Sequence, residues 1–144
     1  MSRETELVWK DARVKLRPWL VMDRVENLCD SGMPDVYYEP LQRDATPGWL
    51  ELKCAEKLPA RPMTPVFGSR GLRTSQINWA DDHPRSRIFV LARFGNEMGL
   101  YNRRLLFTFN GLTIEQLRIG ALVHGIQDKR LWEEIARILL FGLS

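Results

Sequence analysis

Apolar residues recur with a helical period at both ends of the chain. The repeats are formed by Val8, Ala12 and Leu16, and by Leu131, Ile135 and Leu139. Apolar positions four residues apart predict amphipathic helices, here over residues 3–16 and 128–141. We expect the first helix to end before Arg17, because Pro18 disfavours helical backbone at the residue before it. The second helix either packs on the core or forms a dimer interface, and its pattern suits both.

Between these helices, β-rich and apolar runs predict a series of strands. They cover residues 19–25, 33–38, 49–55, 87–94 and 100–109, the last as one bent strand or two short ones. Two further helices are predicted, over residues 74–82, capped by Thr74 or Ser75, and from Thr113 onward. The order α-β-β-β-α-β, followed by more strand and two C-terminal helices, predicts a mixed α/β or α+β sheet domain.

A long irregular segment separates the third strand from the helix that follows it. Residues 57–71 are rich in residues that interrupt regular structure: Pro59, Pro62, Pro65, Gly68 and Gly71. Long loops inside compact domains are usually functional. We therefore expect this segment to serve a function.

Length and composition fit a single domain over residues 1–144. The chain is 44% apolar and 27% charged, which is ordinary for a globular protein. No apolar run is long enough for a membrane span, and the first residues lack the apolar stretch of a signal peptide. Cys29 and Cys54 make no disulfide framework, and the two histidines give no zinc spacing. We expect a reduced, cytoplasmic protein without a membrane partner.

Charge is unevenly distributed along the chain. Residues 1–60 carry nine Lys and Arg against eleven Asp and Glu, whereas residues 61–104 carry eight against three. The eight cations of the second stretch are all arginines: Arg61, Arg70, Arg73, Arg85, Arg87, Arg93, Arg103 and Arg104. An acidic section beside an arginine-rich one suits a site that gathers cations next to a surface that gathers phosphates. A solvated basic face without a ligand has the same composition.

One group of charged residues suggests chemistry. The turn Gly32-Met33-Pro34-Asp35 precedes a loop and then a strand with Glu51 and Lys53. Strand residues two apart share a face, and a hairpin between the two strands would bring Asp35 to Glu51. Two carboxylates with water and phosphate oxygens are the usual ligands of Mg²⁺. Lys53 would then position a water nucleophile or neutralise charge on phosphorus.

The same residues have a plain structural alternative. Glu51 and Lys53 would then be an exposed ion pair contributing less than about 1 kcal/mol, and Asp35 a solvated residue at a strand end. The apolar character of the strand around Glu51, and the turn at a suitable distance before it, favour a functional site.

The turn ending at Asp35, with Trp49-Leu50-Glu51-Leu52-Lys53, resembles the PD-(D/E)xK nuclease superfamily and, within it, the VRR-NUC branch. Members of this branch carry an Arg-Val-Glu-Asn-like segment before the turn, which residues 24–27 match. They also carry a Gln a few residues before a Trp, which residues 76–79 match. The resemblance covers about residues 5–94 and leaves a C-terminal extension over about 100–144. It implies a restriction-endonuclease-like αβββαβ core.

The resemblance implies a phosphodiesterase that depends on Mg²⁺ or Mn²⁺. The metal ligands would be Asp35, Glu51 and the backbone carbonyl of Leu52. Lys53 would be the catalytic lysine, and Gln76 would orient the site or the attacking water.

Other residues have more than one possible role in this scheme. Glu26 would be a further acidic metal ligand, or it would contact a metal ligand without binding the metal itself. Related nucleases often take this acid from the first helix, which makes Glu4 and Glu6 substitutes. Arg70 and Arg73 precede the Gln76 helix, and are either phosphate contacts or ordinary surface residues.

Small stand-alone members of this branch, of phage or bacterial type, resemble Holliday-junction resolvases and are typically dimers. The resemblance therefore implies a homodimeric DNA endonuclease that acts on branched DNA, in the host cytoplasm if the protein is phage-encoded. Two alternatives stay open. One is a non-specific, nicking or restriction-type nuclease with the same site. The other is a non-catalytic nucleic-acid-binding protein that kept a nuclease-like fold.

Overall fold

The computed structural model describes residues 2–25 and 32–142, which form four α-helices and six β-strands. The helices are α1 (Arg3–Lys15), α2 (Thr74–Asp82), α3 (Ile114–Gly120) and α4 (Lys129–Phe141). The strands are β1 (Leu20–Arg24), β2 (Val36–Pro40), β3 (Gly48–Ala55), β4 (Ile88–Phe94), β5 (Glu97–Asn102) and β6 (Val123–Ile126). Short 3-10 helices in the connections are η1 (Gly68–Arg70), η2 (Arg103–Leu105) and η3 (Phe109–Gly111). The predicted α-β-β-β-α-β order is confirmed.

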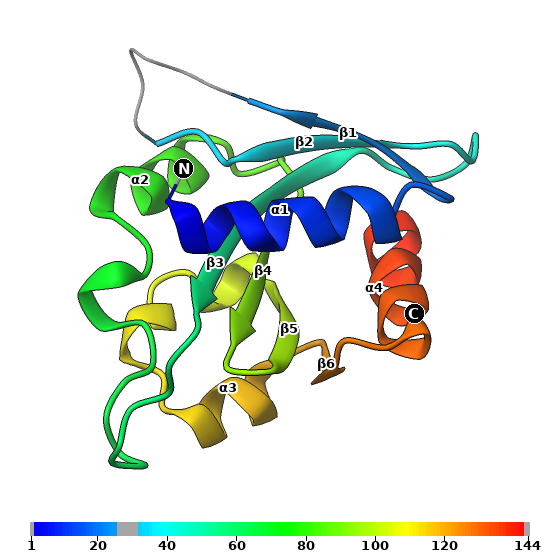
Figure 1. The fold of residues 1–144 in the computed structure, drawn as a ribbon. Helices are drawn as coiled ribbons and strands as arrows, with labels where there is room; N and C mark the ends of the chain where they lie inside the picture. The colour runs from blue at the N-terminus through cyan, green and yellow to red at the C-terminus, as the bar shows by residue number, and fades with distance from the viewer. Residues whose placement is uncertain (1, 26–31, 143–144) are drawn as a thin grey trace.

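The strands join one mixed sheet in chain order, from β1 at one edge to β6 at the other (Figure 1). β3 and β4 run parallel, while the other neighbouring pairs are antiparallel. A parallel pair needs a long crossover connection, which the segment containing α2 provides. This crossover brings α2 against the strand that carries Glu51 and Lys53.

Helices cover both faces of the sheet. α1 and α4 lie on one face (Figure 1), where their apolar residues pack against Leu50 and Leu52 of β3. α2 and α3 pack on the other face through Trp79 and Leu117. The alternation of β3 therefore divides its side chains as the sequence predicts, with Leu50 and Leu52 directed to α1. Glu51 lies on the α2 side.

α4 packs on the core with the apolar face that the sequence predicts. Its buried residues are Leu131, Trp132, Ile135, Ala136, Ile138, Leu139 and Leu140. Asp128 caps the helix by accepting a hydrogen bond from the Leu131 N–H at 2.8 Å, which satisfies one of the unpaired donors of the first turn. Of the two roles considered for this apolar face, the structure supports packing on the core.

The predicted strand over residues 100–109 is wrong in its second half. β5 ends at Asn102, whose side chain accepts a hydrogen bond from the Arg104 N–H at 3.1 Å and turns the chain into η2. β6 was not predicted from the pattern, since it is short, contains Gly125 and is only partly buried. At the start of α2, the N-cap is Arg73 in place of Thr74 or Ser75.

No helix among the described residues combines the length and the apolar character needed to cross a bilayer.

Candidate functional site

The β2–β3 hairpin brings Asp35 to Glu51. Val36 pairs with Leu50 in the antiparallel register, so Asp35, one residue earlier, lies opposite Glu51. Asp35 does not continue the pairing of β2 with β3; its Oδ2 accepts a hydrogen bond from the Leu52 N–H at 2.8 Å. The N–H and C=O of one strand residue point to the same side of the strand. The Leu52 carbonyl that the sequence analysis singled out therefore also lies on the Asp35 side.

Gln76 joins the two charged side chains of β3. Its Nε2 donates to Glu51 Oε1 at 2.8 Å, and its Oε1 accepts from Lys53 Nζ at 3.3 Å. Lys53 Nζ also lies 3.8 Å from Glu51 Oε1. A third bond, from the Arg73 N–H to Gln76 Oε1 at 2.9 Å, fixes the amide against the start of α2. Asp35, Glu51, Lys53 and Gln76 are thus brought together.

A steric constraint explains why the turn before Asp35 has glycine at position 32. A Cβ at residue 32 would overlap the carbonyl oxygen of Ser75 in the first turn of α2. Only glycine allows so close an approach of two backbones. The turn that leads into Asp35 is therefore seated directly against the helix that carries Gln76.

Burial and crowding dominate the electrostatics of Glu51, which is 3% exposed. Burial raises the pKa of its carboxyl well above the ordinary value, and the charge of Asp35 and a hydrogen bond with Asp35 raise that pKa further. Lys53 and Arg73 act in the opposite direction. Two carboxylates crowded together and withdrawn from water repel each other, and a cation between them would relieve that repulsion.

These residues open into a cleft of about 560 Å³. Arg70 and Arg73 line it, as do Ser2 and Glu4 from the start of α1. Glu6, the other first-helix acid considered, forms an ion pair with Arg24 of β1. Glu4 is therefore the first-helix acid that reaches the cleft.

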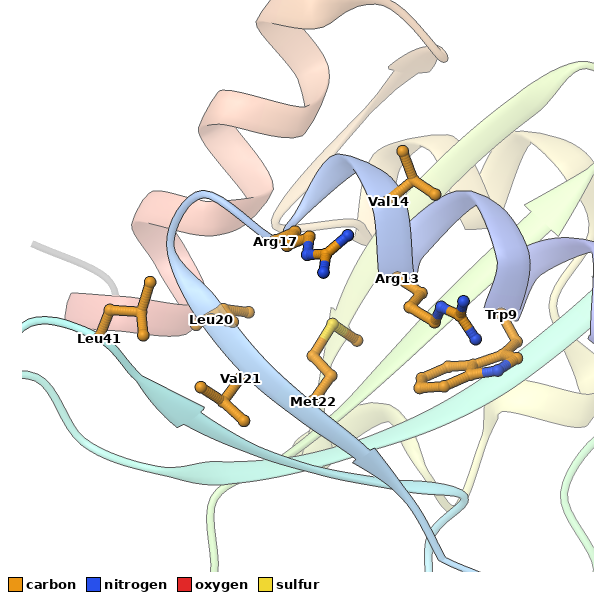
Figure 2. A pocket seen from close by; sticks show the side chains of 8 residues that line it. All are labelled: Trp9, Arg13, Val14, Arg17, Leu20, Val21, Met22 and Leu41. Atoms are coloured by element: carbon orange, nitrogen blue, oxygen red, sulfur yellow. The ribbon is translucent and has the colours of Figure 1, made fainter.

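A second cleft, of about 570 Å³, lies between α1 and β1 (Figure 2). Its lining is mainly apolar, including Val14, Val21 and Leu41, with Arg13 of α1 and Arg17 of the turn after α1 (Figure 2). No carboxylate lines it. The chemistry of the Asp35 cleft therefore has no counterpart here, although the two clefts are similar in size.

The donor set of the Asp35 cleft suits a hard divalent cation, which prefers carboxylate and water oxygens. Asp35 and Glu51 offer two carboxylates, and Glu4 lines the same cleft. Within residues 2–25 and 32–142, no three side chains of His, Cys, Asp or Glu gather closely enough to form a complete ligand group. Glu26, named as a further acid, lies outside the described residues. The described carboxylates fit a metal that keeps several water ligands.

Three of the eight arginines in the basic stretch have structural roles that the sequence analysis missed. Arg87 donates to the carbonyls of Ile138 and Leu139 in α4. Arg103 donates to the Ala80 carbonyl of α2 at 2.6 Å, and Arg93 Nε donates to the Gly95 carbonyl at 3.1 Å. Composition gives no signal that separates these arginines from Arg70 and Arg73 in the cleft, because a residue of any type can present the backbone carbonyl that an arginine binds.

Comparison with known proteins shows what fold the chain has. Models of known protein families give no match, and curated protein sequences give none either. Among solved structures, the chain is similar to Hjc of Archaeoglobus fulgidus, "a Holliday junction resolvase from an archaeal hyperthermophile", with a TM-score of 0.53. The match has 14% identity and covers 81% of this chain and 93% of that one. This similarity establishes the restriction-endonuclease-like α+β fold, with a mixed sheet between helices.

Proposed function

We propose that the protein is a DNA endonuclease that depends on Mg²⁺ or Mn²⁺ and hydrolyses phosphodiester bonds. The observation that carries the proposal is the buried carboxylate of Glu51, held 2.8 Å from Gln76 and 3.8 Å from Lys53, with Asp35 against it in an open cleft. A solvated surface pair would be exposed and would not need a buried amide partner. The fold shared with a Holliday junction resolvase agrees with the proposal.

Asp35 and Glu51 would hold the metal, with the Leu52 carbonyl and Glu4 or Glu26 as further candidate oxygens. Such an ion, when bound, would polarise a phosphate oxygen and lower the pKa of a water molecule. Glu51 is kept in place for this by Gln76, whose Nε2 binds one of its oxygens. Asp35 lies against the same carboxyl group.

Lys53 would supply positive charge at the reacting phosphate. Its side chain is 13% exposed, and Gln76 Oε1 holds its ammonium group at the wall of the cleft. A cation fixed in a partly dry site stabilises developing negative charge more than one in bulk water. Gln76 would set the direction of Lys53 and would orient the attacking water with it.

Arg70 and Arg73 would bind the DNA backbone. Both are exposed and both line the cleft that holds the carboxylates. Guanidinium groups form paired hydrogen bonds with phosphate oxygens. Contacts of this kind position the duplex without reading its sequence.

The finer part of the proposal concerns the substrate and the assembly. We infer that the enzyme prefers branched DNA and acts as a homodimer, because two paired cuts in a junction need two sites related by a two-fold axis. The apolar face of α4 is buried in the core, so the dimer would use another surface. Membership of the VRR-NUC branch remains a prediction from the sequence.

A cleavage assay tests the proposal. Purified protein is incubated with a labelled four-way junction and with a linear duplex, in Mn²⁺ and in EDTA. We expect cleavage in Mn²⁺ only, abolished by Asp35→Ala and retained by Asp44→Ala, which changes an exposed loop aspartate. Absence of any metal-dependent cleavage, or cleavage that survives Asp35→Ala, would reject the enzyme. Analytical ultracentrifugation of the same samples measures the assembly.

The alternatives give different outcomes in this assay. Equal cutting of junctions and random duplexes indicates a non-specific nuclease, a single-strand cut indicates a nickase, and a fixed cut position indicates a restriction-type enzyme. DNA binding with no cleavage in any metal, and no Mn²⁺ binding that depends on Asp35 and Glu51 in a calorimetric titration, indicates a non-catalytic DNA-binding protein.

A further inference from the structure

The loop that brings Arg70 and Arg73 to the cleft is held by a residue from a distant part of the chain. Asn110, in η3, pairs with both backbone groups of Leu72: its Oδ1 accepts from the Leu72 N–H at 2.6 Å, and its Nδ2 donates to the Leu72 carbonyl at 2.7 Å. A primary amide that pairs with both backbone groups of one residue supplies the two hydrogen bonds that a neighbouring β-strand would otherwise supply. Leu72 is only 5% exposed, so these backbone groups need internal partners.

The surroundings of this pairing are shaped to accept it. A Cβ at Gly71 would overlap Asn110 Oδ1, so only glycine next to Leu72 leaves room for the amide. Two further contacts tie the same segments together. The rings of Phe67 and Phe109 lie 5.0 Å apart, and the Val66 N–H donates to the Leu112 carbonyl at 3.1 Å. Residues 66–72 are therefore docked along residues 109–112.

This docking determines where the next residues lie. The segment between β3 and α2 is long and has only the short helix η1 as regular structure, and ordering such a loop costs conformational entropy. Arg70 precedes Leu72 by two residues, and Arg73 follows it directly. The Arg73 N–H in turn donates to Gln76 Oε1. Holding the backbone of Leu72 in place therefore also holds the adjoining backbone of Arg70 and Arg73.

We propose that Asn110 is a positioning residue of the DNA-binding cleft: by clamping Leu72 it holds Arg70 and Arg73 where they meet substrate phosphates. This inference rests on the proposed function. Asn110 itself does not line the cleft and acts through the loop. α2 keeps other anchors, namely the packing of Trp79 and the bond from Arg103 to the Ala80 carbonyl. Loss of the clamp therefore loosens the arginine loop more than it disturbs Gln76.

Hydrogen exchange tests the clamp itself. In Asn110→Ala the Leu72 amide loses its acceptor, and we expect it to exchange faster than in the wild type, with amides of β3 and β4 unchanged. Asn110→Asp keeps the acceptor and loses the donor, so we expect an intermediate rate; it also serves if Asn110→Ala does not fold. Asn78→Ala, an exposed asparagine on α2, is the matched control. An unchanged Leu72 rate in both Asn110 variants would overturn the clamp.

DNA binding without cleavage tests the positioning role. Affinity for a fluorescein-labelled duplex is measured in EDTA at several salt concentrations. For Asn110→Ala we expect affinity to fall roughly five- to tenfold and the salt dependence to weaken by about one released counterion. We expect no further loss when Asn110→Ala is added to the Arg70→Ala/Arg73→Ala double variant, because the clamp acts only through those arginines.

The outcomes separate the two proposals. If the double arginine variant binds weakly but Asn110→Ala binds like the wild type, the positioning role is wrong and the nuclease proposal stands. If Asn110→Ala and the double arginine variant weaken binding additively, Asn110 acts by another route and the inference is again overturned. If wild-type protein does not bind DNA, the proposed function is wrong, and the positioning role that rests on it is wrong as well.

Discussion

At the scale of single residues, Glu51 is buried beside the carboxylate of Asp35. A side chain in this position destabilises the fold, since burial penalises its charged form. Lys53 and Gln76 offset part of that penalty through their contacts with Glu51 Oε1. The residue is better explained by a ligand in the cleft than by the stability of the domain.

Glu51→Gln provides a test of this account. Glutamine keeps the shape and the acceptor for Gln76 Nε2 but removes the buried charge, so we expect the free energy of unfolding in EDTA at neutral pH to rise by about 1 kcal/mol. Metal-dependent cleavage should be lost in the same variant. Urea denaturation measures the stability, and Glu56→Gln, an exposed glutamate just after β3, should leave it unchanged. A less stable Glu51→Gln would contradict the crowding of charges described for this site.

The sequence predicts the residues of this site better than it predicts what surrounds them. Asp35, Glu51 and Lys53 follow from the period of a strand and the register of a hairpin, and Gln76 follows from family resemblance. Asn110 and Arg103 could not be found in this way. Each binds backbone groups. Because residues of different types present the same backbone groups, the residue type at the bound position does not indicate the contact.

At the scale of elements, side chains that bind carbonyls hold the crossover helix in place. Arg103 donates to the Ala80 carbonyl near the end of α2 and to the Ser86 carbonyl beyond it, both at 2.6 Å. The last carbonyls of a helix lack partners within the helix, and a cation there also interacts favourably with the helix dipole. α2 is therefore fixed at one end by Arg103 and at the other by Gln76.

Replacing Arg103 should therefore destabilise the protein, and replacing its neighbour should not. We expect Arg103→Ala to lower the free energy of unfolding by about 2 kcal/mol, because charged hydrogen bonds to partly buried carbonyls are lost. Arg104→Ala, at an exposed position, should change it by less than about 0.5 kcal/mol. Arg103→Lys should restore only part of the loss, since an ammonium group lacks the planar fork. Equal effects of the two alanine variants in urea denaturation would contradict this role.

A second element contact gives a prediction about pH. Arg118 of α3 binds Glu97 of β5 through two hydrogen bonds of 2.9 and 2.7 Å, and these bonds lower the pKa of the Glu97 carboxyl. Because the pKa of Glu97 is lower in the folded than in the unfolded state, the ion pair stabilises the fold at pH values above the ordinary pKa of the carboxyl. This stabilisation is lost as the pH falls through the pKa of the folded state.

Glu97→Gln should accordingly be less stable than the wild type near neutral pH, and the difference should shrink as the solution becomes acidic. The effect is small because Arg118 is well exposed and solvent screens the pair. Thermal unfolding of both proteins across the acidic range measures it. A difference that grows on acidification has the wrong sign and would refute the assignment.

The errors in the predicted elements have physical causes. The residues after Asn102 include an apolar run that suits a strand, but the Asn102 side chain binds the Arg104 N–H and ends the ladder. Phe107 is 72% exposed and Phe109 is fully buried, a difference that arises from packing against Phe67. Contacts of this kind depend on segments distant in sequence, and a local pattern does not contain them.

At the scale of the whole molecule, the proposed metal site should couple to the stability of the fold. An ion that binds the folded state alone raises the free energy of unfolding by about 2.7 kcal/mol when its free concentration is a hundred times its dissociation constant. We expect Mn²⁺ to raise the unfolding temperature of the wild type in proportion, and EDTA to reverse the shift. Asp35→Ala and Glu51→Gln should show no such shift. A similar rise in both variants would place the ion elsewhere.

The pairing of Asn110 with Leu72 also bears on the order in which the chain is made. All four side chains of the candidate site lie between residues 35 and 76, so they leave the ribosome before Asn110 does. The parts proposed to hold the metal are thus synthesised first, and the residue that fixes the proposed DNA-binding arginines is added later. A nascent or truncated chain that stops before η3 would carry the proposed metal ligands without the clamp proposed to position Arg70 and Arg73.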